Sequence, residues 1–157
     1  MKHLLIILSA IFFASCGKKD EEPEPKTSNV SVTVYKQNRL STGEFTNYRV
    51  NSIIHIWRGD NLTIKSSTDA VQGFAYDNTA QKSVSSTYST TDSHLYIKNV
   101  PPGKYLIFVM DVSTSGFGKL ASSHTEFNVN QGEDVELNKI FSYNISSAGS
   151  EDWNKNQ

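Results

Sequence analysis

The chain has 157 residues and a formal net charge of −1, with 37% hydrophobic and 11% aromatic residues. This apolar fraction is enough to build a core, which argues against a wholly disordered chain. Charge is close to balanced and no basic face or stripe is visible, which argues against a nucleic-acid partner. The length fits one domain once the amino-terminal segments are set aside.

The amino-terminal segment, residues 1–16, reads MKHLLIILSAIFFASC. Lys2 gives a positive start, and the run over residues 4–14 is apolar except for Ser9. That run is too short to cross a hydrocarbon core of ~30 Å, which needs roughly 20 residues. Its length is typical of a signal-peptide hydrophobic region, so we expect residues 1–15 to be a signal peptide.

The end of this segment, Phe13-Ala14-Ser15-Cys16, resembles the lipobox of bacterial lipoproteins, with Phe where Leu is usual. In that family the cysteine is lipidated and the chain is cut just before it. The resemblance implies that Cys16 becomes the mature amino terminus and carries acyl chains, two or more of which anchor a protein stably. The alternative is an ordinary secretory signal. Cys16 is the only cysteine, so it would then be a lone thiol in an oxidising compartment.

Charged residues and prolines follow the cysteine, in the run GKKDEEPEPK over residues 17–26. Such a run stays extended and solvated, so we expect residues 16–28 to form the lipidated cysteine and a flexible acidic stalk. Its first part resembles the lipoprotein export signal of Bacteroidetes-type bacteria, carried here by Lys18, Lys19, Asp20, Glu21 and Glu22. The resemblance implies an outer membrane lipoprotein that faces the cell exterior. A periplasm-facing lipoprotein with a plain stalk is the alternative.

Residues 29–145 read as short strands separated by turns. Apolar alternation or short apolar runs predict strands over 29–36, 44–50, 52–57, 61–65, 70–76, 93–100, 104–112, 123–130 and 134–143. Residues 105–110 are apolar throughout, which predicts a central strand covered on both faces. The polar stretch 77–92 is expected to be a loop, and residues 146–157 a disordered tail. No helical period is visible, so an all-β, antiparallel two-sheet sandwich is the expected fold.

The turn Pro101-Pro102-Gly103-Lys104-Tyr105 resembles the turn-and-strand signature of prealbumin-like sandwiches. These include carboxypeptidase regulatory-like and collagen-adhesin B-type modules. The resemblance implies that residues 30–36 form the opening strand and 127–141 the closing hairpin, with Tyr105 entering the core. An immunoglobulin-like sandwich is the alternative. The motif indicates a fold and carries no activity.

Some collagen-adhesin modules join their first and last strands by a Lys–Asn isopeptide bond, and Lys36 and Asn144 are the nearest counterparts here. The acid that such modules require would fall on Val109, so we expect Lys36 to be solvated at a strand end. For hydrolases, no Gly-x-Ser-x-Gly elbow is present. The carboxylates Asp92, Asp111, Glu126, Asp134 and Glu136 are scattered, and most of them are expected to be solvated. The carboxy-terminal signature of transthyretin-like hydrolases is also missing. We therefore expect no enzyme and no catalytic residue, with a small hydrolase on a prealbumin-like scaffold as the alternative.

Neither a metal nor another cofactor is expected, because His55, His94 and His124 lie in separate strands without ligand spacing.

Among the aromatic residues, Trp57, Tyr88 and Trp153 are candidates for stacking on a ligand, while burial of Trp57 in the core is the alternative. The expected function is a lipid-anchored cell-envelope protein with a non-catalytic binding or structural sandwich. Its expected partners are the membrane and either a carbohydrate or another envelope protein. A carbohydrate-binding accessory to nutrient uptake is the alternative function.

Replacing Cys16 with Ser is expected to abolish lipidation, since the thiol receives the acyl chains in the family that this segment resembles. Incorporation of labelled fatty acid measures this, and equal labelling of mutant and wild type would contradict it.

Neutralising residues 18–22 with Ser and Ala is expected to move the domain from the cell exterior to the inside of the envelope. Protease treatment of intact cells measures the change. If both proteins are shaved at the same rate, the charged run is only a stalk.

Overall fold

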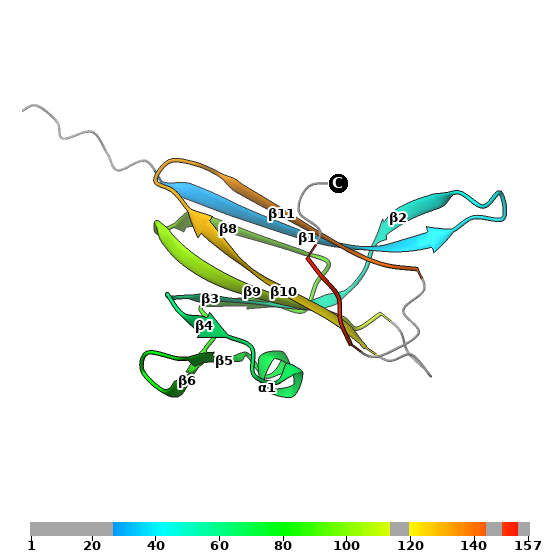
Figure 1. Cartoon of the computed structure of the whole chain (residues 1–157). Coiled ribbons are helices and arrows are strands. Elements are labelled where there is room, and N and C mark those ends of the chain that lie inside the picture. Colours follow the sequence, from blue (N-terminus) through cyan, green and yellow to red (C-terminus); the bar gives the residue numbers. More distant parts are fainter. Residues whose placement is uncertain (1–26, 114–119, 144–148, 154–157) are drawn as a thin grey trace, which may run out of the picture.

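The computed structural model describes residues 27–113, 120–143 and 149–153, and these are almost all in strands (Figure 1). Cys16, the charged residues 18–22 and Asn144 lie outside the described residues. The elements are β1 (Ser28–Arg39), β2 (Phe45–Arg49), β3 (Ser52–Arg58), β4 (Leu62–Thr63), α1 (Ser67–Val71), β5 (Phe74–Asp77), β6 (Lys82–Ser85), β7 (Tyr88–Thr90), β8 (His94–Val100), β9 (Gly103–Asp111), β10 (Ala121–Val129), β11 (Val135–Phe141) and β12 (Gly149–Ser150).

Two main sheets pack face to face. In the first, β1 pairs in parallel with β11 along one edge and antiparallel with β8 and then β2 along the other. The second has the order β12-β10-β9-β3-β7, and a small third sheet has the order β4-β5-β6. All pairs are antiparallel except β1–β11 and β10–β12. The expected all-β sandwich is confirmed.

The first core lies between the two main sheets. The alternating valines of β1, such as Val30 and Val32, face inward and are 1% and 0% exposed. Opposite them, the odd-numbered side chains of β9, including Ile107, belong to the same buried cluster. Alternation places every second side chain of a strand on one face, so these two strands supply much of the first core.

A second core lies on the opposite face of β9. Its even-numbered side chains Leu106, Phe108 and Met110 cluster there with Trp57 and with Ala75 from the small sheet. The layer that covers them, made of β4, α1, β5 and β6, lies beneath the sandwich (Figure 1). The prediction of a central strand buried on both faces is confirmed, because β9 pairs with β3 and β10 and is buried from Tyr105 to Asp111.

This covering layer corrects two sequence-based expectations. Residues 77–92 are not a loop, since they contain β6 and β7. Residues 70–76 are not one strand, because α1 occupies the first part and β5 starts only at Phe74. The Ser66 hydroxyl starts the helix by accepting hydrogen bonds from the backbone N–H groups of Thr68 and Asp69. A five-residue helix is too short to show a period, and polar strands exposed on one side give little apolar signal.

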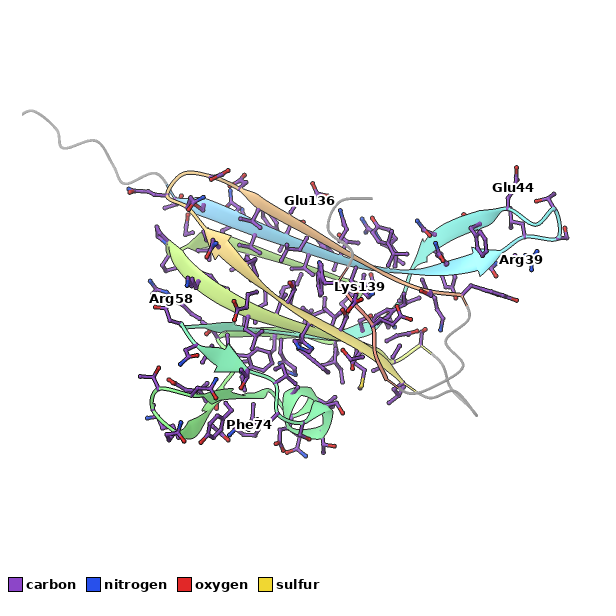
Figure 2. All side chains as sticks on the ribbon, viewed as in Figure 1. Arg39, Glu44, Arg58, Phe74, Glu136 and Lys139 are labelled. Atoms are coloured by element: carbon purple, nitrogen blue, oxygen red, sulfur yellow. The ribbon has the colours of Figure 1, made fainter. Side chains whose placement is uncertain are left out.

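The carboxy-terminal segment is also not a disordered tail where it is described. β12 pairs in parallel with the start of β10, and Trp153 packs against the first core. Lys139 of β11, labelled in Figure 2, donates from Nζ to Glu151 Oε2 at 3.2 Å and to the carbonyl of Asp152 at 2.8 Å. Burial lowers the pKa of Lys139, and the charge of Glu151 opposes that shift. These contacts bridge the two sheets, and the polar sequence gave no sign of them.

The opening strand also begins earlier than expected. Ser28, placed in the stalk by the sequence, is the first residue of β1 and is buried. Its hydroxyl donates to the carbonyl of Asn130 at 2.6 Å and accepts from the backbone N–H of Gly132 at 3.0 Å. Ser28 therefore belongs to the folded domain, where the chain is tied to the β10–β11 turn.

Lys36 is not solvated at a strand end, in contrast to the expectation. It continues the inward-facing even positions of β1, and its Nζ lies 2.8 Å from Asp111 Oδ2, with side chains only 13% and 2% exposed. The other oxygen of Asp111 accepts from the backbone N–H of Ser113 at 2.8 Å. The ion pair closes the end of the first core between the two sheets, where removing one partner would leave a buried charge.

Truncating Tyr105 to Ala is expected to lower the free energy of unfolding by about 3–5 kcal/mol, the cost of removing a buried large aromatic. Tyr105 is 1% exposed, stacks on Phe127 with ring centroids 5.4 Å apart, and donates from its hydroxyl to the Pro101 carbonyl at 2.7 Å. Tyr105→Phe is the control, which keeps the ring and loses a hydrogen bond worth about 1 kcal/mol. Urea unfolding measures both, and equal losses would contradict a core role for the ring.

Candidate functional site

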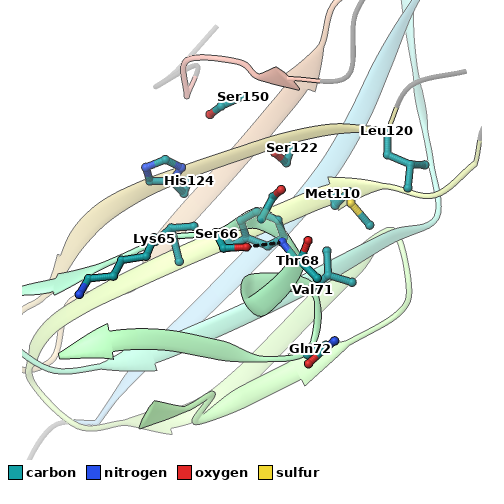
Figure 3. A pocket seen from close by; sticks show the side chains of 13 residues that line it. Lys65, Ser66, Thr68, Val71, Gln72, Met110, Leu120, Ser122, His124 and Ser150 are labelled. Carbon is teal, nitrogen blue, oxygen red and sulfur yellow. Dashed lines mark hydrogen bonds between the residues drawn. The ribbon is translucent and has the colours of Figure 1, made fainter. Parts of the chain in front are cut away.

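A groove of about 630 Å³ lies on the outer face of the second sheet (Figure 3). One wall is formed by α1 and by residues 64–66, which connect β4 to α1, and the other by β10 and β12. Its floor is apolar, formed by Phe108 and Met110 of β9. Three further aliphatic side chains line the groove, namely Ile64, Val71 and Leu120. The other lining residues are polar: Lys65, Ser66, Ser67, Thr68, Gln72, Ser122, His124 and Ser150.

The groove exists because the covering layer ends before the sheet does. The small sheet and α1 pack over β3 and β9, while the outer face of β10 carries polar side chains that need no cover. Ser122 pairs with Met110 across the sheet, and His124 pairs with Phe108. At this boundary the apolar side chains of β9 meet the polar side chains of β10, which gives the groove its mixed lining.

His55 of β3 lies beside this site, under α1. Its Nε2–H donates to the carbonyl of Val71 at 3.1 Å, which fixes the ring against the helix. Nδ1 is buried and has no hydrogen-bond partner among the described residues. Burial lowers the pKa of His55 below its ordinary value of 6.5, and the bond to Val71 opposes that shift. The ring of Trp57 lies 5.7 Å away, centroid to centroid.

The three histidines do not come together. By strand register, His55 and His124 lie on the same face of the second sheet, on either side of Phe108. His94 belongs to the other main sheet, where its Nδ1 lies 3.1 Å from the hydroxyl of Thr33. Within residues 27–113, 120–143 and 149–153, no group of three or more His, Cys, Asp or Glu side chains is placed to hold a metal ion.

The aromatic residues expected to stack on a ligand do not form a platform. Trp57 is 1% exposed and donates from Nε1 to the carbonyl of Gly73 at 3.1 Å, so it belongs to the second core. Tyr88 and Trp153 are half-buried and pack against the first core. The aromatic side chains that are exposed are instead Phe45, Tyr48, Phe74, Tyr96 and Tyr143. Sequence alternation alone does not separate such rings from core rings.

Comparison of the chain with protein-family models and with curated proteins finds no match. Among the described residues, no helix has the length and apolar character needed to cross a membrane.

The half-buried imidazole of His55 predicts a pH dependence of stability. Because its pKa is lowered in the folded protein, the unfolded chain binds a proton more readily, so acid favours unfolding. The contribution of His55 is fully present above pH 6.5 and is lost as the pH falls through the lowered pKa. Replacing His55 with Gln, which retains a donor for Val71, is expected to flatten this part of the profile.

Urea unfolding midpoints between pH 8 and pH 5 measure the effect, where these pH values are approximate bounds around the histidine range. His124→Gln is the matched control, since this exposed ring lies on the same sheet face. Identical pH profiles for the wild type and His55→Gln would show that burial of His55 has no energetic consequence.

Proposed function

We propose that this chain is a lipid-anchored protein of a bacterial cell envelope, held by acyl chains on Cys16 and facing the cell exterior, with a β-sandwich that binds a ligand without catalysis. The anchor is supported by the signal-like residues 1–15 and by the lipobox-like end of that segment. Residues 17–27 would link the lipid to β1, which begins at Ser28. At about 3.3 Å per residue this linker reaches at most roughly 36 Å.

The groove beside α1 carries the binding part of the proposal. Its volume of about 630 Å³ falls in the ~300–1,000 Å³ range of small-molecule sites, and an apolar floor with a polar rim is the composition of such sites. Hydroxyl groups and one imidazole line it, and the described lining holds no carboxylate. A serine there has no acid to orient the imidazole, so we infer binding over hydrolysis. The arrangement suits a ligand with an apolar body and a hydrogen-bonding edge.

A prealbumin-like arrangement of the sandwich is also part of the proposal. It is supported by the turn at Pro101-Pro102-Gly103, after which Tyr105 enters the first core. It is further supported by β1 and β11, which supply the opening and closing strands of the first sheet. This arrangement provides a scaffold, and the ligand is chosen by the surfaces built on it.

Filling the groove is expected to abolish binding of an apolar probe. Thr68 lines the groove from α1 and is exposed, so Thr68→Trp places a large ring in the cavity without entering the core. Asp69→Trp is the matched control, because Asp69 is exposed on the same helix and does not line the groove. The probe is anilinonaphthalene sulfonate, followed by its fluorescence in a titration of the folded protein.

Thr68→Trp should weaken the probe by about tenfold or more, equivalent to about 1.4 kcal/mol of lost binding free energy, and Asp69→Trp should leave it unchanged. Equal affinity of both variants would place the probe elsewhere and remove the support that the groove gives to the proposal.

A further inference from the structure

The two-stranded ribbon of β1 and β2 extends beyond the sandwich (Figure 1). β8 pairs with β1 only up to Thr33 and β11 only up to Lys36, so the rest of β1 is paired with β2 alone. Every residue of β2 is exposed, and Phe45 is 57% exposed. Large aromatic side chains on a projecting ribbon contribute nothing to a core, so their exposure indicates a surface that binds a ligand.

Strand register places a distinct set of side chains on one face of this ribbon. Tyr35 pairs with Arg49, and Arg39 pairs with Phe45. Positions that alternate along paired strands share a face, so both arginines and both rings lie on the same side. Tyr143 packs edge-on against Phe45, with ring centroids 6.4 Å apart. We call this set the arginine–aromatic face; it consists of Tyr35, Gln37, Arg39, Phe45, Asn47, Arg49 and Tyr143.

The charge of this face is local and unpaired. The chain as a whole is slightly negative, yet neither Arg39 nor Arg49 forms an ion pair with any residue that the structure describes. Glu44 lies near Arg39 at the ribbon tip (Figure 2), where its carboxylate accepts from the hydroxyl of Thr42 at 3.3 Å. An exposed guanidinium presents a planar fork of donors that matches a carboxylate.

We propose that the arginine–aromatic face binds an acidic polysaccharide whose sugar rings carry carboxylates. The guanidinium groups of Arg39 and Arg49 pair with the carboxylates, and the exposed rings cover the apolar C–H faces of the sugars. The amides of Gln37 and Asn47 lie between them and are placed to bond sugar hydroxyls. At about 3.3 Å per residue, the face runs for roughly 13 Å along β1, room for more than one sugar ring.

The placement of the ribbon favours a ligand outside the cell over the anionic lipids of the protein's own membrane. This inference rests on the proposed anchor at Cys16. β1 starts where the linker ends and, at about 3.3 Å per residue, runs for roughly 23 Å to the start of the ribbon at Tyr35 and roughly 36 Å to its end at Arg39. The ribbon therefore lies at the end of the strand that is far from the lipid. An acidic peptide would be expected to pair with the free backbone edge of β2, which requires neither the arginines nor the rings.

The test is calorimetric titration of the full mature protein in neutral detergent with polygalacturonate and alginate. Fully methyl-esterified polygalacturonate, which has the same backbone without charge, is the matched ligand control. We expect the charged polymers to bind at least about tenfold more tightly than the ester, the factor that corresponds to about one charge-assisted hydrogen bond. Arg39→Gln/Arg49→Gln should remove that difference, and Phe45→Ala should weaken both charged polymers.

Two further variants separate recognition from bulk charge. Arg39→Lys/Arg49→Lys keeps the charge and removes the fork, so its affinity should fall between the wild type and the glutamine variant. Lys82→Gln/Lys104→Gln removes the same charge from exposed positions on other strands and should bind as the wild type does.

The proposal is overturned if neither polymer binds, if the ester binds equally well, or if the Lys82/Lys104 variant loses as much affinity as the arginine variant. Arginine-dependent binding to phosphatidylcholine vesicles containing phosphatidylglycerol, without polymer binding, would assign the face to lipid. Binding of an acidic peptide that survives Arg39→Gln/Arg49→Gln, without polymer binding, would assign the ribbon to backbone pairing. Fatty-acid labelling at Cys16 tests the anchor separately, so failure of the anchor and failure of this ligand assignment give different results.

Discussion

The architecture depends on one strand that is apolar on both faces. β9 turns Tyr105 and its odd-numbered neighbours toward the first sheet, and Leu106, Phe108 and Met110 away from it. Burying a large apolar side chain is worth about 1.5–3 kcal/mol, so leaving the second set in water would cost roughly 6 kcal/mol. A small domain is stable by only about 5–15 kcal/mol, so the second face of β9 needs a cover. The layer of β4, α1, β5 and β6 provides it.

The candidate binding groove is a consequence of where that cover ends. β10 pairs with β9 and turns Ser122 and His124 outward, and these polar side chains leave no reason to extend the layer over them. Two ion pairs link the two main sheets. Lys36 meets Asp111 at one place and Lys139 meets Glu151 at another. Such pairs contribute little net stability against an apolar core, and we attribute to them the fixing of one register between the sheets.

The sequence predicted those parts of the fold that carry a strong apolar pattern. Alternation identified the inward face of β1, and the unbroken apolar run identified β9 as the central strand. It missed β6 and β7, because strands exposed on one side and rich in Ser and Thr resemble loops. It also missed the carboxy-terminal segment. Glu151 of this segment pairs with Lys139, which is buried, although lysine is a residue type expected at the solvent-exposed surface.

The candidate sites were beyond sequence patterns for a different reason. The groove takes its lining from the segment 64–66 before α1 and from α1, β9, β10 and β12, which no local motif connects. The arginine–aromatic face depends on the pairing of Tyr35 with Arg49 and of Arg39 with Phe45, and register is a property of the folded ribbon. From the sequence, Trp57 is a stacking candidate because the pattern of β3 does not show whether the face that carries Trp57 is exposed or covered by a further layer.

Trp57 reports directly on the layer that covers the second face of β9. The chain has two tryptophans, so Trp153→Phe leaves Trp57, 1% exposed in the second core, as the only indole. Acrylamide quenching of this variant should be slow, with blue-shifted emission in the folded protein and fast quenching only after unfolding in urea. Quenching of the folded variant at the rate of the unfolded chain would show that the covering layer is not packed on the sheet.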